Sequence, residues 1–325
     1  MELRTKIEAD PARQGIDYDT PVLFTGSCFA GEIGRQFIYG KMDVLINPFG
    51  VLYNPYSTAR ALEIIMEGRL FEKDDLYYHN NKYLSFLHDT SFSSGTSQES
   101  IDRINSSVSQ AHSFLSGASF LFITFGTAWV YRWKDNNEIV ANCHKIPAAK
   151  FTRQLLDVED IFDTWSKILS KLKKFNPSLK IVFTVSPVRH LKDGAHGNQL
   201  SKSILIIAIN KLLSSDKSLS YFPSYEIVLD ELRDYRFYSK DMVHPSETAI
   251  EYIWEIFREV YFKPGTNIIY EKIAKITEAT RHRISGNDPY TLAAFRNSML
   301  QKIEKIKNDY PFVDMGAEEK YFNRL

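Results

Sequence analysis

Residues 119–126 read SFLFITFG, an almost continuous apolar run that ends at Gly126. A short run of this kind, bounded by a turn residue, is typical of a strand that is buried on both faces. Helical patterns separate it from four similar runs: 21–26 (PVLFTG), 43–48 (DVLINP), 179–187 (LKIVFTVSP) and 225–231 (YEIVLDE). This alternation predicts an α/β fold, a three-layer α/β/α sandwich around a mainly parallel five-stranded sheet.

The segments between these runs have the spacing of amphipathic helices. Phe29, Ile33 and Phe37 recur four residues apart. Asn54 followed by Pro55 is typical of an N-cap and a first helical residue. Further helices are predicted at about 98–115, 157–174, 198–214 and 247–262.

The remaining segments are less regular. Residues 72–97 are polar and aromatic, and we expect a long loop there, either a lid or an inserted ribbon. WVYRW (129–133) is a candidate for a further strand, and the loose alternation of 1–8 is compatible with an edge strand. After residue 264 the sequence becomes charged and helical. We therefore expect one domain at 1–264 and a helical C-terminal extension at 265–325.

Composition limits the classes of function. The 325 residues are 44% hydrophobic, and 40 basic residues balance 40 acidic ones, which argues against a nucleic-acid-binding surface. Two cysteines are too few for a disulfide framework. Neither a signal peptide nor an apolar run of about 18 residues is visible. These features predict a cytoplasmic protein without a membrane span, and they do not indicate its oligomeric state.

The first candidate for chemistry is Ser27, in the string TGSCFAG at 25–31. It follows a predicted strand and precedes a predicted helix, which places it where open α/β sheets bind ligands. Unpaired N–H groups at the start of the helix could stabilise an oxyanion. Serine is also among the commonest N-caps, so a capping role is the alternative.

The second candidate is the string DMVHPS at 241–246, which precedes the last helix of the domain. A nucleophilic serine needs a base, and that base needs an orienting group. His244 could be the base and Asp241 the orienting group, since a separation of three residues lets both turn the same way. The alternative is that Asp241 caps a turn and His244 packs before Pro245.

Together, the two strings resemble the SGNH or GDSL-like hydrolase superfamily, in which a Gly-x-Ser block starts the domain and an Asp-x-x-His block ends it. The chain resembles the GSCFA-domain family more closely, which is named for the string found here at 26–30. The resemblance extends over about residues 20–262. It includes the blocks NPFGVLYNP (47–55), FGTAWVY (125–131), ANCHKIP (141–147), SPVRH (186–190) and YFPSYEIVLDELRDYRFYSKDMVHPS (221–246).

This resemblance implies that Ser27 is the nucleophile, His244 the base and Asp241 its partner. It also implies an oxyanion hole built from the N–H groups of Ser27, Gly50 and Gly126. The superfamily's third block usually reads Gly-x-Asn, but Ala128 occupies the Asn position here, and Cys28 is a second departure in the first block. Three polar residues could replace the missing donor: Thr127, Asn54 and Asn142.

Other polar residues are candidates for binding substrate. In the string ANCHKIP (141–147), Asn142 and His144 could line the substrate pocket. The alternative is a loop that simply buries the thiol of Cys143. A weaker possibility is that Cys28 is a thiol nucleophile paired with His144. No metal site is predicted, because the residues that could gather into one have no recognised metal-ligand spacing. These residues are Cys143, His144, His190 and Asp193.

The string SPVRH places Arg189 and His190 after the fourth predicted strand, on the reactive edge. Arg189 could bind a carboxylate or phosphate, or it could brace the acidic residues 230–231. Four aromatic residues could form a wall for stacking a sugar, although aromatics near strands are more often core: Tyr53, Trp129, Tyr131 and Trp133.

The function predicted from these residues is hydrolysis of an acyl ester, such as an acetyl group on a carbohydrate, with no cofactor. The expected partner is a small-molecule or carbohydrate ester. An acyltransferase would use the same Ser27–His244–Asp241 site and differ only in its acceptor. A non-catalytic carbohydrate-binding module on a hydrolase fold is the third possibility.

Overall fold

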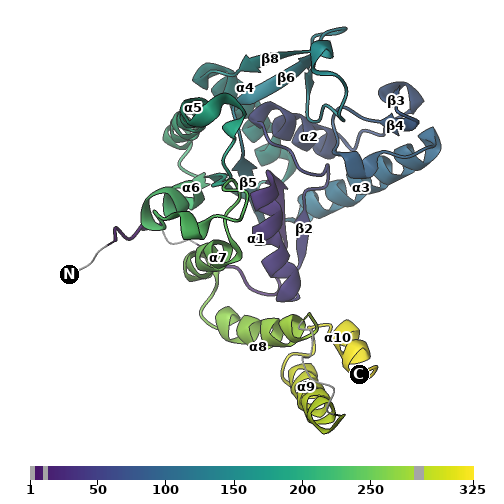
Figure 1. The fold of residues 1–325 in the computed structure, drawn as a ribbon, viewed down its shortest axis with the longest axis vertical. Helices are drawn as coiled ribbons and strands as arrows, with labels where there is room; N and C mark the ends of the chain where they lie inside the picture. The colour runs from purple at the N-terminus through teal and green to yellow at the C-terminus, as the bar shows by residue number, and fades with distance from the viewer. Residues whose placement is uncertain (1–3, 10–13, 282–288) are drawn as a thin grey trace.

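The central sheet of the computed structural model has five parallel strands in the order β10-β9-β5-β1-β2 (Figure 1). The structure describes residues 4–9, 14–281 and 289–325. Counted along the chain within this sheet, the order is 2-1-3-4-5, as in flavodoxin-like doubly wound proteins. The strands are β1 (Val22–Gly26), β2 (Val44–Ile46), β5 (Phe120–Phe125), β9 (Lys180–Val185) and β10 (Ser220–Tyr221).

Helices cover both faces of this sheet, which confirms the predicted three-layer sandwich. One face packs against α2 (Pro55–Glu67), α3 (Ser97–Gly117), α4 (Val158–Phe175) and α5 (Gly194–Ser215). The other face packs against α1 (Cys28–Tyr39) and α7 (Glu247–Tyr261).

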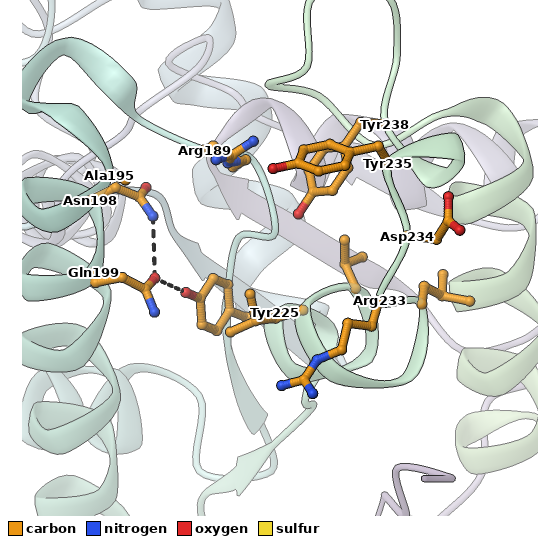
Figure 2. Close-up of a pocket in the computed structure, with 12 residues that line it drawn as sticks. Arg189, Ala195, Asn198, Gln199, Tyr225, Arg233, Asp234, Tyr235 and Tyr238 are labelled. Carbon is orange, nitrogen blue, oxygen red and sulfur yellow. Dashed lines mark hydrogen bonds between the residues drawn. The ribbon is translucent and has the colours of Figure 1, made fainter. Parts of the chain in front are cut away.

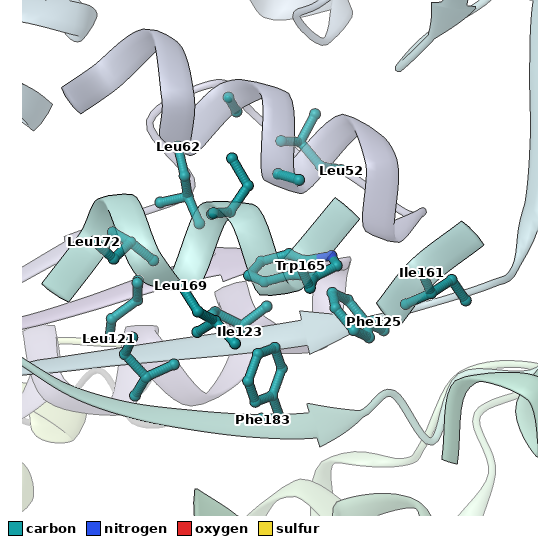
Figure 3. Packing of buried hydrophobic residues seen from close by; sticks show 14 of the residues in the cluster. Leu52, Leu62, Leu121, Ile123, Phe125, Ile161, Trp165, Leu169, Leu172 and Phe183 are labelled. Carbon is teal, nitrogen blue, oxygen red and sulfur yellow. The ribbon is translucent and has the colours of Figure 1, made fainter. Parts of the chain in front are cut away.

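The continuous apolar run of β5 is explained by burial on both faces. Leu121, Ile123 and Phe125 enter one core, whereas Phe120 and Phe122 enter the other. This is the alternation of side chains that a strand imposes. Figure 3 shows the first of these cores, in which Trp165 of α4 lies over the sheet.

Residues 225–231 are helical, so the prediction of a strand there is wrong. The short helix α6 (Ser224–Glu226) continues into one π-helical turn, η5 (Ile227–Glu231). Buried side chains recur at Tyr225, Val228 and Leu232, which is helical spacing. The fifth strand is instead β10, which pairs with β9 just before this segment.

The segment 72–97 contains a short antiparallel hairpin of β3 (Tyr77–His79) and β4 (Lys82–Leu84). The turns η1 (Lys73–Asp75) and η2 (Thr90–Phe92) lie on either side of it. The hairpin corresponds to the ribbon among the predicted alternatives. Residues 4–8 do not form the edge strand predicted at 1–8, and residues 1–3 lie outside the described part of the chain.

The predicted strand at 129–133 exists as β6 (Trp129–Trp133) but belongs to a separate sheet. That sheet is antiparallel, in the order β7-β6-β8, with β7 (Ile139–Val140) and β8 (Phe151–Leu155); η3 (Ala148–Lys150) precedes β8. Because β6 follows β5 directly, the small sheet stands beyond the carboxyl edge of the central sheet (Figure 1).

The described residues after 264 are mostly helical, as predicted. They form α8 (Thr266–Ala279), α9 (Pro289–Asp309) and α10 (Gly316–Phe322), which share a small apolar core and lie together at one end of the molecule (Figure 1). The division of the chain at 264 stays a prediction. No helix within the described ranges has both the length and the apolar character needed to cross a bilayer.

Two contacts hold these C-terminal helices against the end of α1. The Tyr270 ring lies directly against Gly40, where an added Cβ would come within 2.4 Å of it. Lys41 forms an ion pair of 2.6 Å with Glu318 of α10, whose side chain is almost fully buried. The C-terminal helices are therefore packed against the α/β domain.

The start and the end of the α/β domain are joined through Ile16. Its N–H donates to the carbonyl of Tyr261 over 2.6 Å, and its carbonyl accepts from the N–H of Lys263 over 2.9 Å. Ile16 is completely buried. The segment that precedes β1 thus completes the core beside the end of α7.

Candidate active site

Two loops at the carboxyl edge of the sheet are held together by Arg189. Its backbone N–H donates to the carbonyl of Val243 over 3.0 Å, and its guanidinium donates to the carbonyl of Met242 over 3.1 Å. The loop that follows β9 is thereby fixed to the loop that precedes α7. Ligands of open α/β sheets bind at this edge.

Asp241 and His244 form a preorganised pair within the second of these loops. The His244 Nδ1 lies 2.7 Å from one carboxylate oxygen of Asp241, and the other oxygen accepts the backbone N–H groups of Val243 and His244 at 2.9 and 3.0 Å. These hydrogen bonds lower the pKa of Asp241 to about 2, and the backbone N–H of His244 contributes most. An ionised carboxylate only accepts hydrogen bonds, so Nδ1 carries the proton and Nε2 is free to act as a base.

Ser27 lies at the predicted turn between β1 and α1. It is the N-cap residue of α1, but its hydroxyl makes no capping hydrogen bond. Its Oγ is buried and has no hydrogen-bond partner within the described residues, so it is not bonded to His244. An unsatisfied buried hydroxyl costs about 1–3 kcal/mol, and the capping role does not account for it.

A groove of about 650 Å³ begins at this turn and is lined by Cys28, Val188 and His244. The side chain of His244 is half exposed there. Burial raises the pKa of the Cys28 thiol, although the backbone N–H groups of Phe29 and of Cys28 itself act in the opposite direction. His244 and Cys28, the residue that follows Ser27, therefore line the same groove.

The predicted oxyanion hole is not preformed. Each of the four N–H groups donates to a backbone carbonyl: Ser27 to Thr124 (3.1 Å), Gly50 to Asn47 (2.7 Å), Gly126 to Tyr53 (2.8 Å) and Thr127 to Tyr53 (2.9 Å). The Thr127 hydroxyl also lies 3.0 Å from that of Ser201. Sequence position alone could not show which N–H groups the loops already use.

Several predicted binding residues have structural partners. The Asn54 side chain caps α2 by accepting the N–H of Ser57, and Asn142 accepts the N–H of His144. His144 is buried, and its Nε2 lies 2.8 Å from the carbonyl of Ser85. Neither the thiol pair of Cys28 with His144 nor a substrate contact by His144 is favoured by this placement.

A second pocket, of about 230 Å³, brings together other predicted residues. It is lined by Asn54, Thr127, Asn142 and His190, and by three of the four predicted aromatic residues, Tyr53, Trp129 and Tyr131. Trp133 packs instead with Phe151 in a separate cluster. Burial lowers the pKa of His190 to about 4, so its imidazole is neutral at pH 7, and its ring meets that of Tyr53 edge to face.

Arg189 belongs to a third pocket, of about 290 Å³, shown in Figure 2. Its guanidinium lies over the Tyr238 ring, and Gln199, which also lines this pocket, accepts a hydrogen bond from the hydroxyl of Tyr225. Arg189 thus braces the carbonyl of Met242 rather than the acidic residues 230–231.

Lys202 of α5 lies at the same edge, although no sequence motif indicated it. Its side chain is 1% exposed, and its Nζ donates to the carbonyls of Gly126 (2.8 Å) and Ser186 (2.6 Å) at the carboxyl edge. Burial lowers its pKa to about 7. A lysine on the same helical face as the buried Leu205 and Ile209 is a signal that could have identified it, because unpaired lysines are rarely buried.

The remaining candidates do not form a metal centre. Within the described residues, no three His, Cys, Asp or Glu side chains are grouped so that they could hold a metal ion. Cys28 and Cys143 are both free thiols. Asp193 is instead paired with Arg153.

Comparison with known proteins extends these observations. The GSCFA family model matches residues 21–257, and no curated protein matches the chain. A carbohydrate esterase family 2 enzyme with a carbohydrate binding domain, from Corynascus thermopiles (Myceliophthora fergusii), is 15% identical with a TM-score of 0.29; the match covers 44% of this chain and 36% of that one. A carbohydrate esterase family 3 structure from Talaromyces cellulolyticus is 8% identical with a TM-score of 0.36, covering 78% and 99%. At TM-scores this low, the fold assignment comes from the strand order and layers of this chain.

Proposed function

The chain belongs to the GSCFA family, and we propose that this member is an ester hydrolase whose nucleophile is Ser27 and whose base is His244. The observation that carries the proposal is the Asp241–His244 pair, which is fixed by three hydrogen bonds and whose histidine lines a groove together with Cys28, the residue after Ser27. The resemblance of the two sequence blocks to SGNH-type hydrolases supports the same assignment of roles.

In this mechanism, Nε2 of His244 removes the Ser27 proton while Oγ attacks the ester carbonyl. Asp241 stays ionised, holds the imidazole and stabilises its cation. The imidazolium then protonates the leaving alcohol, and water activated by His244 releases the acyl group from Ser27. Since the Ser27 hydroxyl has no partner among the described residues, its reorientation for attack breaks no hydrogen bond.

The developing oxyanion needs donors other than those expected from the family resemblance. The first N–H groups of α1, at Cys28 and Phe29, have no acceptor four residues back within the helix. They lie at the positive end of the helix and directly follow the nucleophile. We assign the oxyanion hole to these two groups.

A fluorophosphonate probe tests this proposal because it reacts with an activated serine. We expect the wild type and Cys28→Ala to be labelled and Ser27→Ala to remain unlabelled, each with an unchanged circular dichroism spectrum. Labelling of Ser27→Ala, or loss of labelling in Cys28→Ala alone, would reject Ser27 as the nucleophile. Intact ligand binding without any labelling would favour a non-catalytic module.

An acyltransferase remains the rival for the same site, and the aromatic second pocket gives it specific support. That pocket is lined by Tyr53, whose carbonyl lies next to Gly126 together with the Cβ of Ser27. It is large enough for a small acceptor alcohol. Turnover of an acetyl ester with and without added sugar acceptor separates the two activities. Hydrolysis predicts free acetate in both cases, whereas transfer predicts an acetylated acceptor.

A further inference from the structure

We infer that the groove at His244 binds an extended, uncharged glycan chain that carries the ester, and that helix α8 forms its far end. This inference rests on the proposed ester hydrolysis. It adds a substrate class and gives the C-terminal helices a role, since α8 lies beyond the residues that the family model matches.

The length of the groove is the first argument. It runs from Cys28 and His244 along α1 to Tyr39, and it also includes Glu278 of α8 and Arg281 just after that helix. The stretch of α1 from Cys28 to Tyr39 alone spans about 16 Å at 1.5 Å per residue. A groove of about 650 Å³ and this length is several times larger than an acetyl group requires.

The lining is the second argument, because it is polar and acidic. Four glutamates line it against two arginines, Arg35 and Arg281. Glu32 is paired with Arg35 at 2.8 Å, whereas Glu247, Glu251 and Glu278 form no ion pair with any described residue. Carboxylates accept hydrogen bonds from hydroxyl groups and repel anions. The groove therefore suits a hydroxyl-rich chain without carboxylate or phosphate groups.

The position of the C-terminal helices is the third argument. The guanidinium carbon of Arg281 lies 3.8 Å from the centre of the Tyr39 ring, which closes the end of the groove opposite His244. The contact of Gly40 with Tyr270 fixes α8 in this place. The far subsite is thus built jointly by α1 and the C-terminal helices.

The test compares O-acetylated xylose, xylohexaose and a hexagalacturonide as substrates of the full chain. We expect kcat/KM to rise from the monomer to the neutral hexamer and to fall for the acidic hexamer. In Arg281→Ala, the hexamer-to-monomer ratio of kcat/KM should drop about tenfold, as for the loss of one polar contact. Arg103→Ala, which removes an exposed arginine of α3 instead, should keep the wild-type ratio.

Equal kcat/KM for monomer and hexamer, or a ratio that Arg281→Ala leaves unchanged, would overturn the inference while the hydrolase proposal stands. Calorimetric titration with unacetylated xylohexaose separates the opposite case. If no ester is turned over but the wild type binds the hexamer about tenfold more tightly than Arg281→Ala, the hydrolase proposal fails and the groove assignment stands. Absence of both turnover and binding overturns both.

Discussion

Asp241 is the residue whose role can be tested most directly, because its contacts define what it must do. It accepts three hydrogen bonds, one of them from Nδ1 of His244. In Asp241→Asn, the new side-chain amide could present a donor to Nδ1 and favour the wrong tautomer of the imidazole. We expect this variant to lower kcat by roughly four orders of magnitude in a p-nitrophenyl acetate assay. A loss smaller than tenfold, with the melting temperature unchanged, would show that Asp241 does not orient the base.

Lys202 couples the stability of the fold to pH. Its pKa is about 7 in the folded protein and returns to the ordinary 10.5 on unfolding. Between these values the unfolded chain binds more protons, so the free energy of unfolding rises with pH by up to about 1.4 kcal/mol per unit. Urea denaturation across this range should show that slope in the wild type and its loss in Lys202→Met. Parallel pH profiles for the two proteins would contradict the assignment.

At the scale of elements, α4 packs against one face of the sheet, and Trp165 is its largest buried side chain. Trp165 is completely buried between Phe125 and Phe183, and its indole N–H donates to the carbonyl of Pro55 over 3.1 Å (Figure 3). We expect Trp165→Ala to lower the free energy of unfolding by about 3–5 kcal/mol, measured by urea denaturation. Trp165→Phe retains most of the ring contacts and should cost clearly less. Equal costs would mean that the hydrogen bond, rather than ring packing, dominates.

The elements that the sequence predicted correctly are those with one dominant pattern. The strands at 21–26, 119–126 and 179–187 are buried on both faces, which explains their nearly continuous apolar runs. The run at 225–231 has a short apolar centre flanked by acidic residues, and its buried positions follow a helix. A run of this length does not by itself separate a strand from a helix.

The candidate site was predictable to the extent that it depends on the order of segments. Parallel strands place the turn of Ser27 and the loop of His244 at one edge, and that follows from the pattern alone. The pattern could not predict which backbone N–H groups are free, because contacts between loops decide this. The carbonyl of Tyr53, for example, accepts the N–H groups of both Gly126 and Thr127. Lys202 was missed because its partners are backbone carbonyls, which no sequence motif records.

For the whole molecule, the contact between α1 and the C-terminal helices can be tested at Gly40. A Cβ at this position would come within 2.4 Å of the Tyr270 ring, so Gly40→Ala should destabilise the protein by about 1–3 kcal/mol through overpacking. Gly265→Ala is the matched control, because no atom lies within 4 Å of its added Cβ. Melting temperatures measure both. Equal melting temperatures for the two variants would show that α8 can move away from the added methyl group without destabilising the protein.

The backbone bonds of Ile16 also bear on how the chain is made. Because its partners are Tyr261 and Lys263, the core beside β1 cannot close until the ribosome has released almost the whole α/β domain. Until then, the apolar face that β1 presents to α7 stays open to water and to other nascent chains. The order of the segments along the chain therefore makes this apolar face a binding site for chaperones during synthesis.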